Sequence, residues 1–197
     1  MKQFSIPIFI RVFKRPELTN QLLNTIASIN PVNIYVCSDG PREDVIGESE
    51  KIQETRQIID NFRWHNKPKV NKLYLNKNTG FPNILPKGLD WFFNENEYGI
   101  FLDDDHDPNI SFFNYCHELL LRYRNDNQIH IITGSNFIPS KTKTKNSYFF
   151  SKIPSLWGFA TWSRVWESLD SNKLFKLNNQ EFEEIIKRNV DSKNWKY

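Results

Sequence analysis

Four aspartates lie within five residues of one another and directly follow a short apolar run at 100–102. The aspartates are Asp103, Asp104, Asp105 and Asp107. Carboxylates this close repel one another, so the cluster is stable where solvent screens it or where a cation binds. Oxygen ligands suit a hard cation, and we expect Mn²⁺ or Mg²⁺. The alternative is an acidic surface turn that binds nothing.

Zinc is not expected, because the four histidines lack the spacing of a zinc site. They are His65, His106, His117 and His130. His106 lies inside the acidic cluster. We interpret it as a loop histidine without a ligand role, and contact with a phosphate group is the alternative.

Three further charged residues are candidates for binding a nucleotide. Asp39 follows a predicted strand at 32–37, where a carboxylate can accept from a ribose hydroxyl or a base N–H. The alternative is a turn aspartate before Gly40. Arg15 follows the first predicted strand, and Lys87 is expected at the start of the helix that precedes the acidic cluster. Each can meet a diphosphate or a base, or be a solvated surface charge.

The chain contains no GxGxxG, GxxxxGK[ST] or GxSxG motif. This argues against a dinucleotide-dependent dehydrogenase, a P-loop enzyme and an α/β-hydrolase.

Apolar runs alternate with amphipathic segments along the first two thirds of the chain, which indicates alternating strands and helices. This order predicts an α/β protein whose mostly parallel central sheet has helices on both faces. We expect Pro86 in the first turn of the third helix. The predicted strands are 6–13, 32–37, 69–75, 100–102 and 128–133, and the predicted helices are 16–29, 47–62, 83–94 and 109–123.

The pattern changes after Gly134. Residues 139–146 form a Lys/Thr-rich loop, which we expect to be solvated, with a lid over an anionic substrate as the alternative. A strand at 147–150 and helices at 164–169 and 177–188 are predicted. The aromatic stretch 157–162 is a hydrophobic anchor or the wall of a sugar site, and core packing is the alternative.

The composition is that of one globular domain. The chain has 197 residues, of which 39% are hydrophobic and 15% aromatic. A net charge of +3 is too mild to indicate nucleic acid as a partner. No apolar run approaches the ~20 residues of a membrane span, and no signal peptide is apparent. Cys37 and Cys116 are expected to be buried free thiols in a reducing cytoplasm, so we expect a cytoplasmic protein, at most peripheral to the inner membrane.

Taken in order, several short segments resemble the nucleotide-diphospho-sugar glycosyltransferases with a GT-A fold. The similarity is to bacterial members akin to family 2 enzymes and to the N-acetylglucosaminyltransferase I group. The segments cover nearly the whole chain; they are 13–16, 38–42, 78–80, 88–93, 102–105, 111–113, 134–137 and 157–162.

The resemblance implies a Rossmann-like GT-A fold in a single domain at 1–197, with a nucleotide-binding half at 1–107 and an acceptor-side half at 108–197. It also implies roles for individual residues. Asp105 would bind the metal, and Asp103 and Asp104 would lie near the ribose and the sugar. Asp39 would contact the nucleoside, and Arg15 the base or a phosphate.

The resemblance further implies a metal-dependent glycosyltransferase that moves a sugar from a UDP-sugar to a glycan or other hydroxyl acceptor, with inversion, in bacterial surface glycan synthesis. Relatives usually continue past this length and carry their catalytic base late in the chain. Asp191 is the candidate base here, with Glu167 and Asp170 among the alternatives. A sugar-phosphate nucleotidyltransferase and a non-catalytic carbohydrate- or cation-binding module are the alternative functions.

Overall fold

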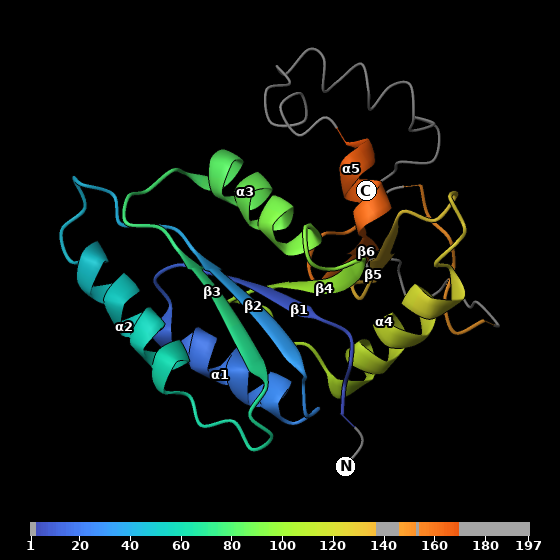
Figure 1. Ribbon diagram of the computed structural model, residues 1–197, viewed down its shortest axis with the longest axis horizontal. Coiled ribbons are helices and arrows are strands. Elements are labelled where there is room, and N and C mark those ends of the chain that lie inside the picture. Colours follow the sequence, from blue (N-terminus) through green and yellow to red (C-terminus); the bar gives the residue numbers. More distant parts are fainter. Residues whose placement is uncertain (1–2, 137–145, 153, 170–197) are drawn as a thin grey trace.

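The computed structural model describes residues 3–136, 146–152 and 154–169 (Figure 1). In this part of the chain six strands form one sheet in the order β3-β2-β1-β4-β6-β5, with five helices around it. The strands are β1 Ile8–Val12, β2 Asn33–Ser38, β3 Lys69–Tyr74, β4 Tyr98–Asp103, β5 Ile131–Thr133 and β6 Phe159–Trp162. The helices are α1 Pro16–Ala27, α2 Glu48–Asn61, α3 Phe81–Phe93, α4 Ile110–Arg122 and α5 Ser163–Ser168.

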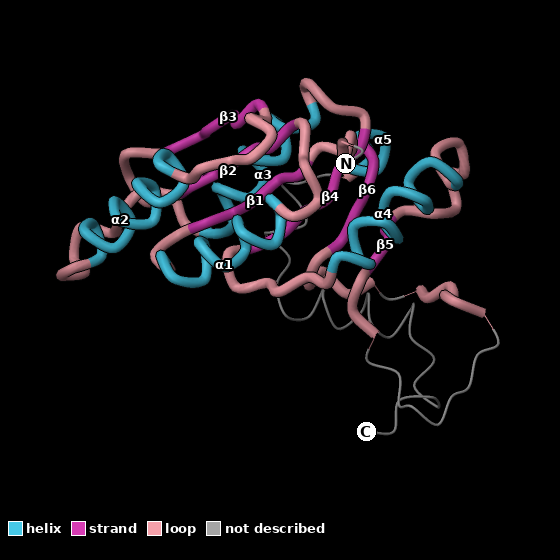
Figure 2. The backbone as a smooth tube through the Cα atoms, turned by 90° about the horizontal axis from the view of Figure 1, so that it is seen from below, coloured by secondary structure: helices cyan, strands magenta, loops and turns pink. Residues whose placement is uncertain are grey.

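The first four strands of the chain are parallel to one another, and β6 is antiparallel to both of its neighbours, β4 and β5. Figure 2 shows the strands side by side, with β3 at one edge of the sheet and β5 at the other. This confirms the predicted α/β class and the mostly parallel sheet of a Rossmann-like fold.

Side chains of the central strands alternate between two cores, because successive residues of a strand point to opposite faces. Ile8 and Ile10 of β1 belong to the core shared with α1, α2 and α4. Phe9, between them, belongs to the core under α3. Figure 1 shows α1 and α2 on one side of the sheet and α3 on the other, which confirms helices on both faces.

The structure corrects one predicted strand and adds a strand that was not predicted. Residues 147–150 were expected to form a strand but have no strand structure. Instead, β6 forms within the aromatic stretch and lies between β4 and β5. Its Trp162 is 1% exposed and donates its indole N–H to the Leu120 carbonyl at 3.2 Å. Core packing is therefore the role of Trp162, whereas Trp157 is 71% exposed.

The start of one helix also differs from expectation. Helix α3 begins at Phe81, so Pro82 is the proline of its first turn and Pro86 lies inside the helix. Helix α4 begins at Ile110, close to its predicted start at residue 109. The N-cap of α4 is Asn109, whose side chain accepts from the Ser111 N–H at 3.0 Å.

Both cysteines are buried and free, as predicted. Among the helices of the described residues, none combines the length and the apolar character needed to cross a membrane. The Lys/Thr run at 141–145, the predicted helix at 177–188 and Asp191 lie outside the described residues. The division of the domain at residue 107 stays a prediction, although strands from both halves belong to the same sheet.

Candidate functional site

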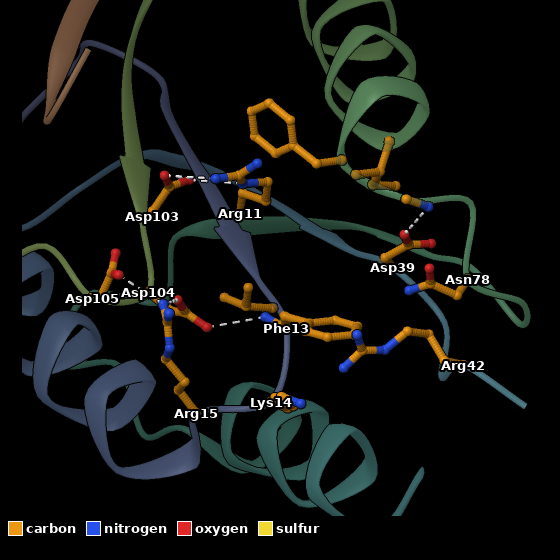
Figure 3. Close-up of a pocket in the computed structure, with 14 residues that line it drawn as sticks. Arg11, Phe13, Lys14, Arg15, Asp39, Arg42, Asn78, Asp103, Asp104 and Asp105 are labelled. Carbon is orange, nitrogen blue, oxygen red and sulfur yellow. Dashed lines mark hydrogen bonds and ion pairs between the residues drawn. The ribbon is translucent and has the colours of Figure 1, made fainter. Parts of the chain in front are cut away.

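A cavity of about 420 Å³ lies at the carboxyl ends of the central strands. From β1 the chain continues to β2 and β3 in one direction, while β4 lies on the other side of β1. Such a reversal of strand order opens a crevice, which is where open α/β sheets bind ligands. Figure 3 shows the cavity residues converging from the ends of the strands. They come from 11–15, from Asp39 and Arg42, from the segment 78–84 and from 103–105.

Arg11 of β1 and Asp103 of β4 form a paired contact on the α3 side of the cavity. The two residues are register partners on neighbouring parallel strands. The guanidinium donates from Nε and Nη2 to the two carboxylate oxygens, at 2.8 and 2.7 Å. It also lies over the Phe81 ring, 4.4 Å from the ring centroid. Both oxygens of Asp103 are therefore already engaged.

Asp104 turns to the opposite side of the sheet and is 4% exposed. Its carboxylate accepts from the Phe13 backbone N–H at 3.0 Å and from Arg15 Nη1 at 2.9 Å. Burial raises the pKa of the Asp104 carboxyl, while the hydrogen bonds from Phe13 and Arg15 oppose that rise. This carboxylate ties the end of β4 to the segment that follows β1.

Asp105 is the more accessible acid, with a side chain that is 44% exposed. It accepts from the same Arg15 Nη1 at 2.7 Å, so the half-exposed guanidinium bridges Asp104 and Asp105. We call Asp103, Asp104 and Asp105 the acidic tip. Within the described part of the chain, the two arginines offset two of the three carboxylate charges, which leaves the tip with one net negative charge.

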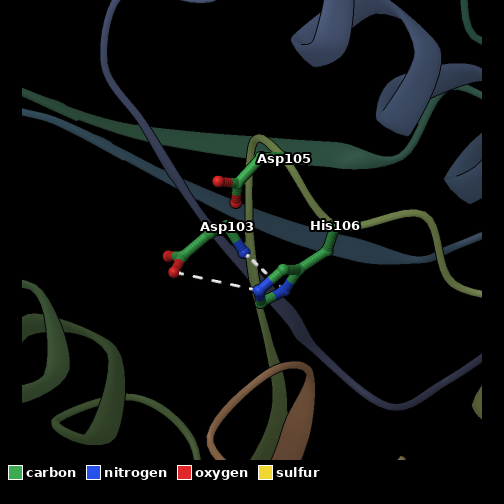
Figure 4. A group of neighbouring side chains, drawn as sticks. All are labelled: Asp103, Asp105 and His106. Carbon is green, nitrogen blue, oxygen red and sulfur yellow. Dashed lines mark hydrogen bonds and ion pairs between the residues drawn. The ribbon is translucent and has the colours of Figure 1, made fainter. Parts of the chain in front are cut away.

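Figure 4 shows the group of the described residues that could hold a cation: Asp103, Asp105 and His106. One ligand atom from each lies within 4.8 Å of the others. His106 Nδ1 accepts from the Asp103 N–H at 3.1 Å, so a neutral ring carries its proton on Nε2. In that tautomer neither ring nitrogen is available to a cation. The carboxylates of Asp103 and Asp105 fit a hard cation such as Mg²⁺ or Mn²⁺.

Asp39 follows β2 as predicted and is 5% exposed. Its oxygens accept from the backbone N–H groups of Gly40, Thr79 and Gly80, at 2.9 to 3.1 Å. The Thr79 hydroxyl donates to it as well, at 3.2 Å. Asp39 therefore clamps the loop before α3 to the end of β2. It also lines the cavity, and its contact with a nucleoside stays a prediction.

Lys14 and Arg42 form a second charged group at the cavity, which we call the cationic wall. Both bind Glu48, the first residue of α2, whose side chain is completely buried. Lys14 Nζ lies 2.8 Å from Oε1, and the Arg42 backbone N–H donates to Oε2 at 2.9 Å. The Arg42 guanidinium, with Lys14, lowers the pKa of Glu48 to about 2. One carboxylate against two cations leaves the wall with one positive charge.

The structure does not place Lys87 in the cavity. Because α3 begins at Phe81, Lys87 lies in the middle of the helix rather than at its start, and it is exposed. Conversely, the cavity is also lined by three residues that were not predicted from the sequence: Arg11, Arg42 and Phe81. For Arg11 a signal exists, because a charged residue inside an apolar strand requires a partner.

The cavity therefore has two poles, a net negative acidic tip and a net positive cationic wall. A neutral nucleoside has no charge that either pole would bind. A cation bound to a phosphate ester has one group for each pole, because the cation suits the acidic tip and the phosphate suits the cationic wall. No model of a known protein family matches this chain, and a search among curated proteins found no match.

Proposed function

We propose that this chain is a metal-dependent glycosyltransferase with a GT-A fold. Its donor is a nucleotide-diphosphate sugar, a UDP-sugar, and its acceptor is a hydroxyl group of a surface glycan. The observation that carries the proposal is the cavity of about 420 Å³, which joins the acidic tip to the cationic wall at the reversal of strand order. A volume in this range suits a ligand of nucleotide size.

The residues of the cavity divide between the two ends of such a donor. Asp39 and Asn78 lie at the β2 and β3 side and would face the nucleoside. Lys14 and Arg42 would face the phosphate groups, because guanidinium and ammonium groups bind phosphate oxygens strongly. Asp105, together with Asp103, would hold Mn²⁺ or Mg²⁺.

The bound cation would supply electrostatic stabilisation of the departing diphosphate. A carboxylate would accept the proton of the acceptor hydroxyl as that oxygen attacks the anomeric carbon from the opposite side, with inversion. Asp191 is the candidate for this role and lies outside the described residues. Lys14 and Arg42 would hold the diphosphate in place during the reaction.

Titration calorimetry of UDP in the presence of Mn²⁺ tests the proposal. Asp105→Asn removes the accessible carboxylate of the tip and should weaken Mn²⁺-dependent UDP binding at least tenfold. Asp107→Asn is the matched control, because Asp107 is an exposed aspartate of the same sequence cluster that does not line the cavity. Failure of the chain to bind UDP, or equal effects of the two substitutions, would contradict the proposed site.

Transfer is tested separately, with a panel of UDP-sugars and hydroxyl acceptors analysed by mass spectrometry. A mass increase of one sugar residue on an acceptor supports glycosyl transfer. Pyrophosphate release from a sugar 1-phosphate and a nucleoside triphosphate would indicate a nucleotidyltransferase instead. UDP binding without any transfer would favour a binding module.

A further inference from the structure

Every carboxylate of the acidic tip already has an arginine partner. Arg11 holds Asp103 through two hydrogen bonds, and Arg15 bridges Asp104 and Asp105. A cation that binds Asp105 must therefore compete with the positive charge of Arg15. The inference below rests on the proposed function and concerns how the cation and the diphosphate enter the same cavity.

We propose that Arg15 couples the two ligands of the cavity. It occupies Asp105 until a divalent cation arrives together with a phosphate group that accepts the displaced guanidinium. The cation alone then binds weakly, and cation and diphosphate bind as a pair.

The two arginines differ in their freedom to move. The Arg11 side chain is 22% exposed, and its guanidinium packs over the Phe81 ring. The Arg15 side chain is 50% exposed, and Asp105 is 44% exposed. Ion pairs this exposed are weak, because water competes for both partners. Arg15 is therefore the arginine that can leave its carboxylate.

Departure of Arg15 also leaves the buried Asp104 with a partner. Its carboxylate keeps the hydrogen bond from the Phe13 N–H, on the residue two positions before Arg15. Arg15 itself lines the cavity, so a phosphate group there lies within reach of its side chain. Guanidinium groups bind phosphate with two parallel hydrogen bonds, which offsets the lost contact with Asp105.

The charges of the acidic tip give the direction and size of the change in cation affinity when Arg15 is replaced. With both arginines in place, the tip offers a divalent cation only one uncompensated negative charge. Replacing Arg15 by a neutral residue raises this to two. Removing one unit charge at roughly 5–6 Å from a divalent ion changes its affinity about tenfold, even at the dielectric constant of water.

The experiment measures binding of Mn²⁺ alone, by the electron paramagnetic resonance signal of the free ion, with and without UDP. Arg15→Gln should bind Mn²⁺ alone about tenfold more tightly than the unchanged chain, while UDP should enhance its Mn²⁺ affinity less. Arg15→Lys keeps the charge and should bind Mn²⁺ alone as weakly as the unchanged chain. Arg15→Met is a second neutral variant in case Arg15→Gln does not fold.

Arg124→Gln is the control for loss of an exposed arginine, because Arg124 pairs with Glu97 away from the cavity. It should leave both Mn²⁺ measurements unchanged. If the neutral variants at position 15 bind Mn²⁺ no more tightly than the unchanged chain, the coupling is refuted, while binding of UDP that depends on Asp105 would still support the site. If the unchanged chain does not bind UDP with Mn²⁺, both proposals fail.

Discussion

Glu48→Gln is the substitution whose effect on stability the structure defines most closely. The Glu48 side chain is completely buried and accepts hydrogen bonds from Lys14 Nζ, from the Arg42 guanidinium and from the Arg42 backbone N–H. It joins the segment after β1 to the segment after β2 at the first turn of α2. Neutralising it removes the shared partner of both cations of the wall.

The expected loss of stability in Glu48→Gln follows from the pKa of the Glu48 carboxyl. Folding lowers it from 4.5 to about 2, mainly through the hydrogen bonds from Arg42. A difference of about 2.5 units corresponds to at most about 3 kcal/mol in the free energy of unfolding at neutral pH. Lys14 and Arg42 are 40% and 51% exposed, so solvent screening reduces this to roughly 1–2 kcal/mol.

The sign of the pH dependence is fixed by the direction of the shift. Because the pKa of Glu48 is lower in the folded state, its contribution to the free energy of unfolding is complete above about pH 5. That contribution is lost as the pH falls through 4.5 towards 2. The linkage between protonation and folding predicts that roughly 40% of this stabilisation by Glu48 is lost at pH 3.5.

Urea unfolding of the unchanged chain and of Glu48→Gln, at pH 7 and at pH 3.5, measures both quantities. Glu54→Gln is the control, because Glu54 lies on the same helix and makes an exposed pair with Lys51. A difference between the unchanged chain and Glu48→Gln that stays constant from pH 7 to pH 3.5 would refute the reasoning. A loss of unfolding free energy in Glu48→Gln that is as small as the loss in Glu54→Gln would also refute it.

Two further predictions concern packing and thiol reactivity. Gly40→Ala should lower the free energy of unfolding by about 1–3 kcal/mol in urea titration, because the new Cβ would lie 2.5 Å from backbone atoms of Lys77. Gly47→Ala should lower it by only about 1 kcal/mol, because no atom of the described residues beyond the two chain neighbours of Gly47 lies within 4 Å of the new Cβ and the cost is that of a φ of +78°; equal effects of the two substitutions would contradict the predicted clash. Burial raises the pKa of Cys37 to about 12 and also raises the pKa of Cys116. Ellman's reagent at pH 8 should therefore label neither thiol until urea is added. Rapid labelling of the native protein would contradict this prediction.

The parallel part of the sheet was predictable because its central strands are buried on both faces. Such strands appear in the sequence as apolar runs of strand length, and β1, β2 and β4 all do. The antiparallel strand β6 has no comparable local signal, since its four residues depend on pairing with β4 and β5. Residues 147–150 show the reverse case, a strand-like aromatic run that forms no strand. Tyr148 there packs against α4 and shares a hydroxyl hydrogen bond with Tyr123, without any strand pairing.

The acidic tip was predictable from residue type and position, whereas the pairing of Arg11 with Asp103 depends on strand register. Phe9 and Phe101 are buried on the α3 side of their strands, and the next residue on that side is Arg11 in β1 and Asp103 in β4. Once β1 and β4 are known to be neighbours in this register, the two charges must meet. The order of strands in the sheet is what a single sequence does not contain. The acids therefore suggested an open cation site, and only the register of β1 against β4 shows that Arg11 already binds Asp103.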